Sequence, residues 1–304
     1  MNSPEVPTST PTPLNGIGYI TPPAGYTLSG RDGRVTISWE GKPPIPLLEE
    51  DLASLQGGAP DYDMVGRGIY QALRLDPECA HAADYAAVLK DAYPHIVSEL
   101  GGQIIMLDAK EVDSPYLDRK ITFLKILALL DPANAGLQVE IGRTFAERGT
   151  RLAALQQAVE SWYGAERHLK KAQELGAPDS HVAYEYGEAL YVVGRYGQAA
   201  EVWTEALPGL AGGERSRLEA RIAAILAGKL PLVPPLDYLT ALAVALEERS
   251  AGRNDEAAAI IEDILADPFF AEQFPMGEVY FLLGTCYQEL GMVNEAAEAF
   301  GRSR

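Results

Sequence analysis

Apolar residues follow a helical period over most of the chain. One stripe holds Val65, Ile69 and Ala72 and ends at Asp76-Pro77, a pair that stops a helix. Residues 121–132 repeat this design with leucines on one face and a closing proline. Apolar positions spaced three and four residues apart are typical of helices that bury one face. The pattern therefore predicts an all-α protein.

A different pattern precedes the helices. Tyr26 and Leu28 alternate with polar residues, as do Val35, Ile37 and Trp39, and a glycine-containing turn separates the two groups. Alternation on both sides of such a turn predicts a β-hairpin. Two strands alone are only marginally stable in water. We therefore expect the apolar face of the hairpin to dock on the helical body, the alternative being a partner.

Composition divides the chain into three segments. Residues 1–22 are rich in Pro, Thr and Ser and predict an extended or disordered leader. Residues 23–58 hold the hairpin and a connector at 42–46, whose prolines are expected to break any regular element. Residues 59–304 are expected to form one helical repeat domain.

One spacing of small and bulky residues occurs three times in the helical part. The series are Gly187, Gly194, Ala199, Trp203 and Ala206; Gly284, Gly291, Ala296 and Phe300; and Ala245, Gly252, Ala257, Ile261 and Ile264. A small residue in mid-helix allows a second helix to cross closely, and the glycine that follows ends the first helix. Because one helix pair cannot bury its own apolar face, such pairs must stack.

These residue types and offsets resemble the tetratricopeptide repeat (TPR) family, most specifically over residues 180–206 and 277–300. The resemblance implies an α-solenoid, a right-handed superhelix of helix pairs, here with a short N-terminal β-hairpin segment. The small mid-helix residues of successive units lie farther apart in the sequence than the family's period of about 34 residues. The excess residues predict insertions at 94–115, 152–163, 216–230 and 266–275, of which the second and third are expected to be helical.

In this family the first helix of each pair lines a concave groove, so the resemblance implies candidate groove residues. The candidates for peptide binding are Arg143, His181, Tyr184, Glu188, Tyr191, Phe281 and Gln288. Tyr184, Glu188 and Tyr191 share one helix face, and aromatic residues contribute much of the energy of interfaces. We expect both tyrosine rings to be partly exposed. One TPR subgroup grips chaperone tails with a cationic clamp, which these groove positions lack, so an adaptor of that type is not expected.

Charge and cysteine content narrow the class of partner. The net charge of −18 argues against a nucleic-acid partner and permits a basic protein partner, although an acidic surface is more often simply a soluble one. Cys79 and Cys286 form neither a disulfide framework nor a metal quartet, which suits a reducing compartment. The chain has no signal-peptide pattern and no apolar run of about 18 residues, so we expect no membrane insertion and a cytoplasmic location.

Motifs that carry chemistry are missing from the sequence. The nearest metal-like group is Cys79, His81 and Asp84, but residues two apart at a helix start diverge, so no metal site is predicted. Gly66-Arg67-Gly68 lacks the third glycine of a phosphate loop, and no Gly-x-Ser-x-Gly elbow occurs. We therefore predict no catalytic residue, no cofactor and no enzymatic activity.

These observations favour a scaffold or adaptor that binds a peptide or helix of a partner protein in the concave groove. The alternative is an accessory or substrate-recognition subunit of an enzyme complex, in which residues 94–115 and the hairpin form a ligand pocket with contacts at Asp108 to Asp113. A third hypothesis is a self-assembling structural protein. The last helix, Asn294 to Arg302, has no following helix to cover it, which predicts weak self-association or a partner contact there.

Overall fold

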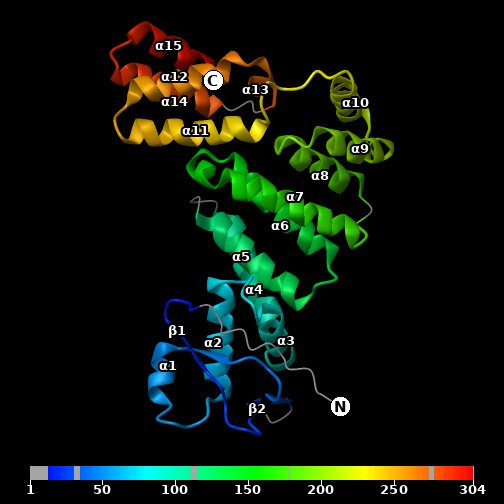
Figure 1. Ribbon diagram of the computed structural model, residues 1–304, viewed down its shortest axis with the longest axis vertical. Coiled ribbons are helices and arrows are strands. Elements are labelled where there is room, and N and C mark those ends of the chain that lie inside the picture. The colour runs from blue at the N-terminus through cyan, green and yellow to red at the C-terminus, as the bar shows by residue number, and fades with distance from the viewer. Residues whose placement is uncertain (1–12, 31–34, 111–114, 178, 274–276, 304) are drawn as a thin grey trace, which may run out of the picture. The chain divides into compact units, whose positions relative to one another are not determined.

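A computed structural model describes residues 13–30, 35–110, 115–177, 179–273 and 277–303 (Figure 1). These residues hold fifteen α-helices and four short strands, so the predicted all-α class with a short N-terminal strand segment is confirmed. The chain divides into two compact units, Met1–Leu137 and Gln138–Arg304, a division that the sequence analysis did not predict. The predicted segment boundaries at residues 22 and 58 stay predictions. Among the described helices, none combines the length and the apolar character needed to cross a membrane.

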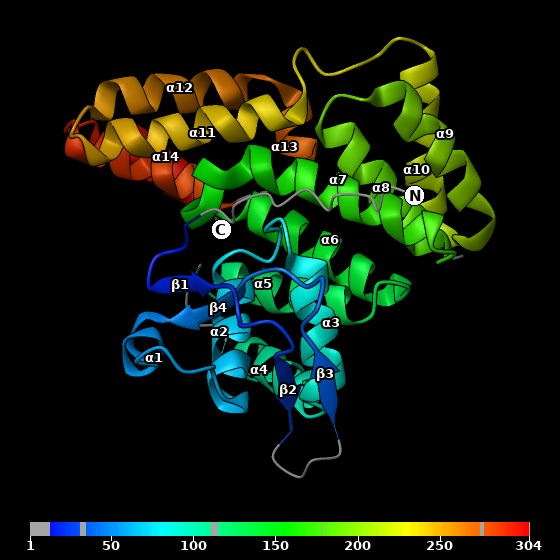
Figure 2. The ribbon, with the colours of Figure 1, turned by 60° about the horizontal axis from the view of Figure 1, so that its bottom comes forward.

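The first unit contains all four strands and five helices. The strands are β1 (Ile17–Ile20), β2 (Thr27–Ser29), β3 (Thr36–Ser38) and β4 (Ile45–Leu48). The helices are α1 (Glu49–Ser54), α2 (Tyr62–Leu75), α3 (Ala82–Ala92), α4 (Ile96–Lys110) and α5 (Pro115–Leu130). The strands form two antiparallel pairs, β1 with β4 and β2 with β3 (Figure 2).

The β2–β3 pair is the predicted hairpin. Leu28 pairs with Ile37, and both Leu28 and Trp39 are buried in the same core as the helix residues Ile69 and Tyr85. The indole Nε1 of Trp39 donates a hydrogen bond of 2.8 Å to the carbonyl of Pro43, which satisfies its polar atom. The predicted docking of the hairpin on helices is therefore confirmed.

The prediction that prolines prevent regular structure at 42–46 is wrong for Ile45 and Pro46. Both belong to β4, which pairs with β1, and Pro46 lies opposite Tyr19. Proline is tolerated because each strand of a two-stranded sheet has one side that needs no hydrogen-bond donor. Ile45 is fully buried, and the Pro46 carbonyl lies so close to Gly68 of α2 that a Cβ there would be 1.9 Å away. Burial against α2 thus stabilises a strand that local propensity disfavours.

The second unit is built from antiparallel helix pairs. Helix α6 (Ala135–Thr150) spans the division between the units and is followed by the 3₁₀ helix η1 (Leu152–Gln157) and α7 (Ala158–Glu174). Next are α8 (Ser180–Val192), α9 (Tyr196–Ala206), η2 (Leu207–Gly209) and α10 (Gly212–Leu226). The last helices are α11 (Pro235–Ser250), α12 (Asn254–Ala266), α13 (Pro268–Gln273), α14 (Gly277–Glu289) and α15 (Val293–Arg302).

The predicted contacts between small and bulky residues are present in these pairs. A Cβ on Gly187 would lie 2.3 Å from the ring of Trp203, and one on Gly284 would lie 2.7 Å from the ring of Phe300. At the ends of the first helices, Gly194 and Gly291 have φ values of 81° and 75°, a left-handed conformation that glycine adopts without strain. The repeat spacing therefore predicted both the close crossing and the helix ends.

The predicted insertions are mostly helical. Residues 94–115 contain α4, residues 216–230 fall largely on α10, and residues 266–275 contain the short α13. The extra helix predicted at 152–163 begins instead as the 3₁₀ helix η1 and continues as the first turns of α7.

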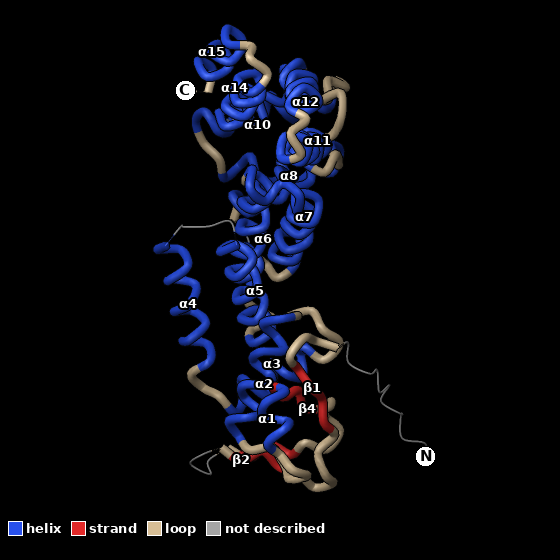
Figure 3. Tube along the Cα trace, turned by 90° about the vertical axis from the view of Figure 1, so that its left-hand side faces the viewer, coloured by secondary structure: helices blue, strands red, loops and turns tan. Residues whose placement is uncertain are grey.

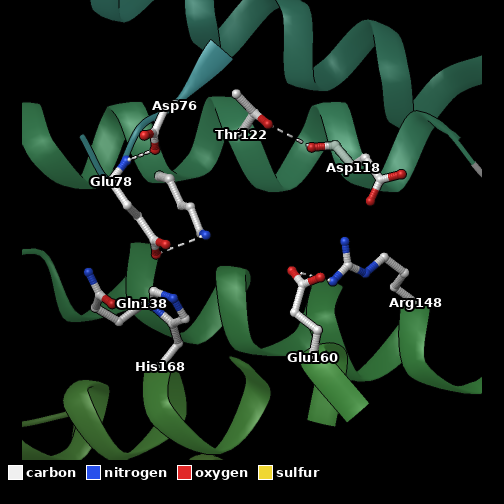
Figure 4. Close-up of polar contacts among 9 residues, drawn as sticks. Asp76, Glu78, Asp118, Thr122, Gln138, Arg148, Glu160 and His168 are labelled. Carbon is white, nitrogen blue, oxygen red and sulfur yellow. Dashed lines mark hydrogen bonds and ion pairs between the residues drawn. The ribbon is translucent and has the colours of Figure 1, made fainter. Parts of the chain in front are cut away.

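Polar side chains between α6 and α7 are matched with one another (Figure 4). The Nδ1 of His168 lies 2.8 Å from Oε1 of Gln138. The guanidinium of Arg148 donates hydrogen bonds to Ser161 at 2.9 Å and to Glu160 at 3.0 Å. Buried polar groups need such partners. These residues therefore have a structural role between the two helices.

Candidate functional site

The second unit contains a cleft of about 700 Å³ lined by residues of α8, α10 and α13. Three of the seven predicted groove residues, Tyr184, Glu188 and Tyr191, line this cleft. Its volume lies within the range of about 300–1,000 Å³ that is usual for ligand sites. The cleft is therefore the candidate functional site.

Helix α8 presents these three residues because its other side packs on α9. Asp179 caps the start of α8 by accepting a hydrogen bond of 2.9 Å from the backbone N–H of His181. In the middle of the helix, Gly187 faces Trp203, whose indole Nε1 donates a 3.0 Å hydrogen bond to the carbonyl of Tyr184. The packing of α8 on α9 thus fixes which face of α8 lines the cleft.

Arg221 of α10 lines the cleft and contacts residues of α8 and α9. Its guanidinium carbon is 4.4 Å from the ring centroid of Tyr191 and 4.3 Å from that of Trp203. The same guanidinium forms an ion pair with Glu188. Such stacking on aromatic faces is favourable and suits arginine better than lysine. Arg221 therefore joins α10 to both α8 and α9.

The carboxyl of Glu188 belongs to a small polar network. Burial raises its pKa above the ordinary value, and the nearby charge of Arg221 opposes this effect. The hydroxyl of Tyr184 is close enough to the same carboxyl to help lower its pKa. The pKa of Tyr184 is in turn raised by burial and by the negative charge of Glu188. Tyr184, Glu188 and Arg221 thus form one connected group.

The outer part of the cleft carries an excess of positive charge. Arg217 and Lys229 line it, are exposed, and form no ion pair with any residue that the structure describes. Glu214 is the one acidic residue beside them among the described lining residues, since Glu188 is paired with Arg221. In a chain of net charge −18 this local balance is unusual. It favours acidic groups in a ligand, in contrast to the basic partner that the net charge permits.

The expectation that both tyrosine rings are partly exposed is wrong for Tyr191. Its side chain is only 5% exposed, because Arg221 covers one side and Tyr196 packs edge-on at a centroid distance of 5.0 Å. Tyr184 is half-buried, as expected. Tyr191 therefore supports the cleft wall, and Tyr184 is the ring that is available for contact.

The other four predicted groove residues do not line this cleft. Arg143 donates a 2.9 Å hydrogen bond to Glu185 and so connects α6 to α8. His181 and Gln288 are exposed, and Phe281 is 57% exposed with its ring 5.4 Å from that of Phe300. A binding role for these four residues stays a prediction.

Arg221, Arg217 and Lys229 are the site residues that sequence reasoning missed. The segment 216–230 was recognised as a helix outside the repeat, and nothing in its pattern shows which neighbour it covers. A usable signal was the presence of three basic residues within thirteen positions of an acidic chain. Their arrangement around the α8 residues depends on non-local packing.

A second cavity, of about 410 Å³, lies in the first unit. Residues 94–96 and Glu99 of the predicted insertion line it together with residues of α2 and α3. Asp108, which was considered for a ligand pocket, instead forms an ion pair of 2.8 Å with Lys120, and Asp113 lies outside the described residues. Within the described part of the chain, no three His, Cys, Asp or Glu residues are grouped closely enough to hold a metal ion.

Comparisons with known proteins do not assign the chain to a family. No family model matches the chain, and no curated protein sequence matches it. One crystal structure of a MamA protein aligns over 69% of this chain and 91% of its own, with 17% identity and a TM-score of 0.30. Another MamA structure aligns over 65% of this chain and 91% of its own, with 18% identity and a TM-score of 0.28. Identities and TM-scores this low carry no information on function.

Proposed function

We propose that the protein is a non-enzymatic interaction scaffold of the TPR-like type, which binds a segment of a partner protein in the cleft between α8, α10 and α13. The observation that carries this proposal is the convergence of Tyr184, Glu188 and Arg221 on one cleft of about 700 Å³. Two of these residues come from a repeat helix and the third from an inserted helix. Repeat proteins commonly use such combinations of regular scaffold and insertion for recognition.

The partner segment would gain energy from two features of the cleft and from two exposed leucines outside its lining. The ring of Tyr184 offers an amphipathic contact surface, and aromatic residues of this kind dominate interface hot spots. Arg217 and Lys229 would attract acidic side chains. Leu226 and Leu232, which are 78% and 87% exposed and flank Lys229 in sequence, would add apolar contacts. An acidic peptide with interspersed apolar residues fits these features.

The interactions inside the cleft support a binding role. Glu188 is engaged by Arg221, and Tyr184 lies close to its carboxyl. These features stabilise a preformed surface, which lowers the entropic cost of association.

Comparative affinity capture tests the proposal. Wild-type protein and the variants Tyr184→Ala and Tyr163→Ala are used to capture partners from lysate of the source cells, with quantitative mass spectrometry as the readout. Tyr163 is a matched control, because it is an exposed tyrosine on α7 that does not line the cleft. We expect at least one protein to be lost from the Tyr184→Ala sample and retained by Tyr163→Ala. Equal capture by all three proteins would refute the assignment of the cleft.

A further inference from the structure

Phe269 lines the cleft between α8, α10 and α13, but it has no part in the function proposed above. It is half-buried, whereas its neighbour Phe270 is only 1% exposed. Both residues belong to the short helix α13. Phe270 therefore anchors this helix in the core of the second unit, and Phe269 is presented to the cleft.

Buried polar contacts hold α13 in place. The carboxyl of Asp267, a buried residue, accepts a hydrogen bond of 2.9 Å from the backbone N–H of Phe269. The hydroxyl of Tyr238 of α11 donates a hydrogen bond to the same carboxyl, and its ring packs edge-on against Phe270 at a centroid distance of 5.5 Å. Burial, together with the hydrogen bond to Asp267, raises the pKa of Tyr238, so its hydroxyl remains a donor. Residues outside the cleft lining thus fix the position of Phe269.

Helix α13 meets the cleft near the C-terminal end of α8. Helices α8 and α11 lie next to one another in the second unit (Figure 3). A Cβ on Gly194, which follows α8, would lie 3.0 Å from Pro234, which precedes α11. Tyr238 lies about one turn farther along α11 and holds Asp267 at the start of α13. Phe269 is therefore placed at this end of the cleft.

The C-terminal part of α10 lies at the same end, because α8 and α10 run in the same direction along the cleft. Burial is the largest cause of the raised pKa of Tyr184, in the first half of α8, and Glu214 at the start of α10 contributes to it. Farther along both helices, the guanidinium carbon of Arg221 lies 4.4 Å from the ring centroid of Tyr191. The order of contacts along α8 therefore follows the order of residues along α10.

An apolar subsite results at this end of the cleft. Ile225, one turn beyond Arg221 on α10, lines the cleft and is half-buried, as is Phe269. Ala224 lines it beside Ile225 and adds only a small side chain. The apolar surface that these residues leave uncovered gains free energy when a ligand covers it. Lys229, one turn farther along the chain, supplies the positive charge next to this surface.

We propose that Phe269 and Ile225 bind one apolar side chain of the partner segment, and that Phe269 thereby determines which acidic segments bind. This role rests on the function proposed above, in which Arg217 and Lys229 attract the acidic residues of that segment. Exposed ion pairs are weak and distinguish poorly among acidic peptides. An apolar subsite distinguishes them, because a polar side chain placed there loses hydrogen bonds to water.

A library of random short peptides displayed on phage tests the preference. Full-length wild type, Phe269→Ala and Tyr184→Ala proteins each select from the library, and the enriched peptides are sequenced. We expect the wild type to enrich peptides that combine acidic and apolar residues, and Phe269→Ala to enrich acidic peptides without the apolar preference. Identical preferences of these two proteins overturn the role of Phe269 and leave the function of the cleft intact. If no enrichment depends on Tyr184, the proposed function fails, and the role of Phe269 fails with it.

Calorimetry on one selected peptide measures the size of the effect. The peptide is compared with a form in which glutamine replaces its apolar residue. We expect the wild type to bind the apolar form at least about tenfold more tightly, and Phe269→Ala to lose most of this ratio. Tyr163→Ala, which removes an exposed ring outside the cleft lining, should keep the ratio. Phe269→Leu restores an apolar side chain and should also keep it. A folded Phe269→Ala protein with the ratio of the wild type contradicts the proposal.

Discussion

Gly187 of α8 faces the indole of Trp203 of α9 so closely that a Cβ atom at position 187 would lie 2.3 Å from the ring. The missing side chain allows the two helices to cross at short distance. The same indole is covered by Arg221 of α10, which also pairs with Glu188. A packing feature visible in the repeat pattern therefore supports the residues that form the candidate site.

Gly187→Ala is expected to destabilise the second unit by about 2 kcal/mol, because the methyl group forces the indole or the helix to move. Gly197→Ala is the matched control, since a Cβ at that helical position would meet nothing within 4 Å. Alanine there is expected to be neutral or slightly stabilising. Urea unfolding followed by circular dichroism measures both. A Gly187→Ala protein as stable as the control would show that the crossing is not tight.

Trp39→Ala is expected to destabilise the first unit by about 3 kcal/mol, as truncation of a large buried side chain does. Trp39 is buried against the helices and its indole is hydrogen-bonded to Pro43. The exposed neighbour Glu40 provides a control, and Glu40→Ala should leave the unfolding curve unchanged. If Trp39→Ala also leaves the curve unchanged, the hairpin contributes nothing to the core.

The stability of the second unit should depend on pH through Glu188. Burial raises the pKa of this carboxyl above its ordinary value of 4.5, in spite of Arg221. A raised pKa means that the folded state binds the proton more tightly than the unfolded chain does. The resulting stabilisation is complete below the ordinary value and is lost as the pH rises through the raised value. The side chain of the Glu188→Gln variant does not titrate, so the stability of that variant lacks this dependence on pH.

We therefore expect the melting temperature of the wild type, relative to that of Glu188→Gln, to fall as the pH is raised from about 4 to about 8. Thermal melts of both proteins in matched buffers measure this difference. If the difference in melting temperature instead increases with pH, the pairing with Arg221 outweighs burial, and the pKa of Glu188 is not raised.

Two arginines on α10 allow the effect of charge inside the cleft to be distinguished from the effect of the net charge of the protein. Arg217 lines the cleft, whereas Arg215 pairs with Glu219 at 2.9 Å and does not line it. Replacing either by glutamate changes the net charge equally. We expect Arg217→Glu to weaken binding of a captured acidic partner at least about tenfold and Arg215→Glu to leave it nearly unchanged. Isothermal titration calorimetry with each variant measures the affinity for the partner. Equal losses of affinity in the two variants would indicate that long-range electrostatics alone attracts the partner.

Local spacing in the sequence was sufficient to predict the helix pairs. Gly187 and Trp203, or Gly284 and Phe300, are sixteen residues apart in both series, so one short connection fixes how each pair packs. The hairpin was predictable for a similar reason, since Leu28 and Ile37 are close in sequence and separated by a turn. Residues that contact one another within such local units can be recognised from their spacing in the sequence.

Non-local packing was not predictable. Helical periodicity places Tyr191 on a face of α8 but does not show that Arg221, thirty residues later, covers that face. Likewise, Pro46 belongs to β4 because α2 buries the strand and β1 pairs with it, which local propensity does not reveal. The cleft forms where a helix outside the repeat contacts the repeat, so its cationic part could not be located from spacing.

Site-specific photo-crosslinking tests most directly whether the α8–α10–α13 cleft holds a partner segment. Ala224 and Ala223 are neighbours on α10, but only Ala224 lines the cleft, while Ala223 is exposed elsewhere. Each is replaced in turn by p-benzoylphenylalanine in the source cells, with folding checked by thermal melting. If the cleft holds a partner segment, we expect a discrete crosslinked protein from position 224 and little or none from position 223. Equal crosslinking from both positions, or none from position 224 in a folded protein, would contradict it.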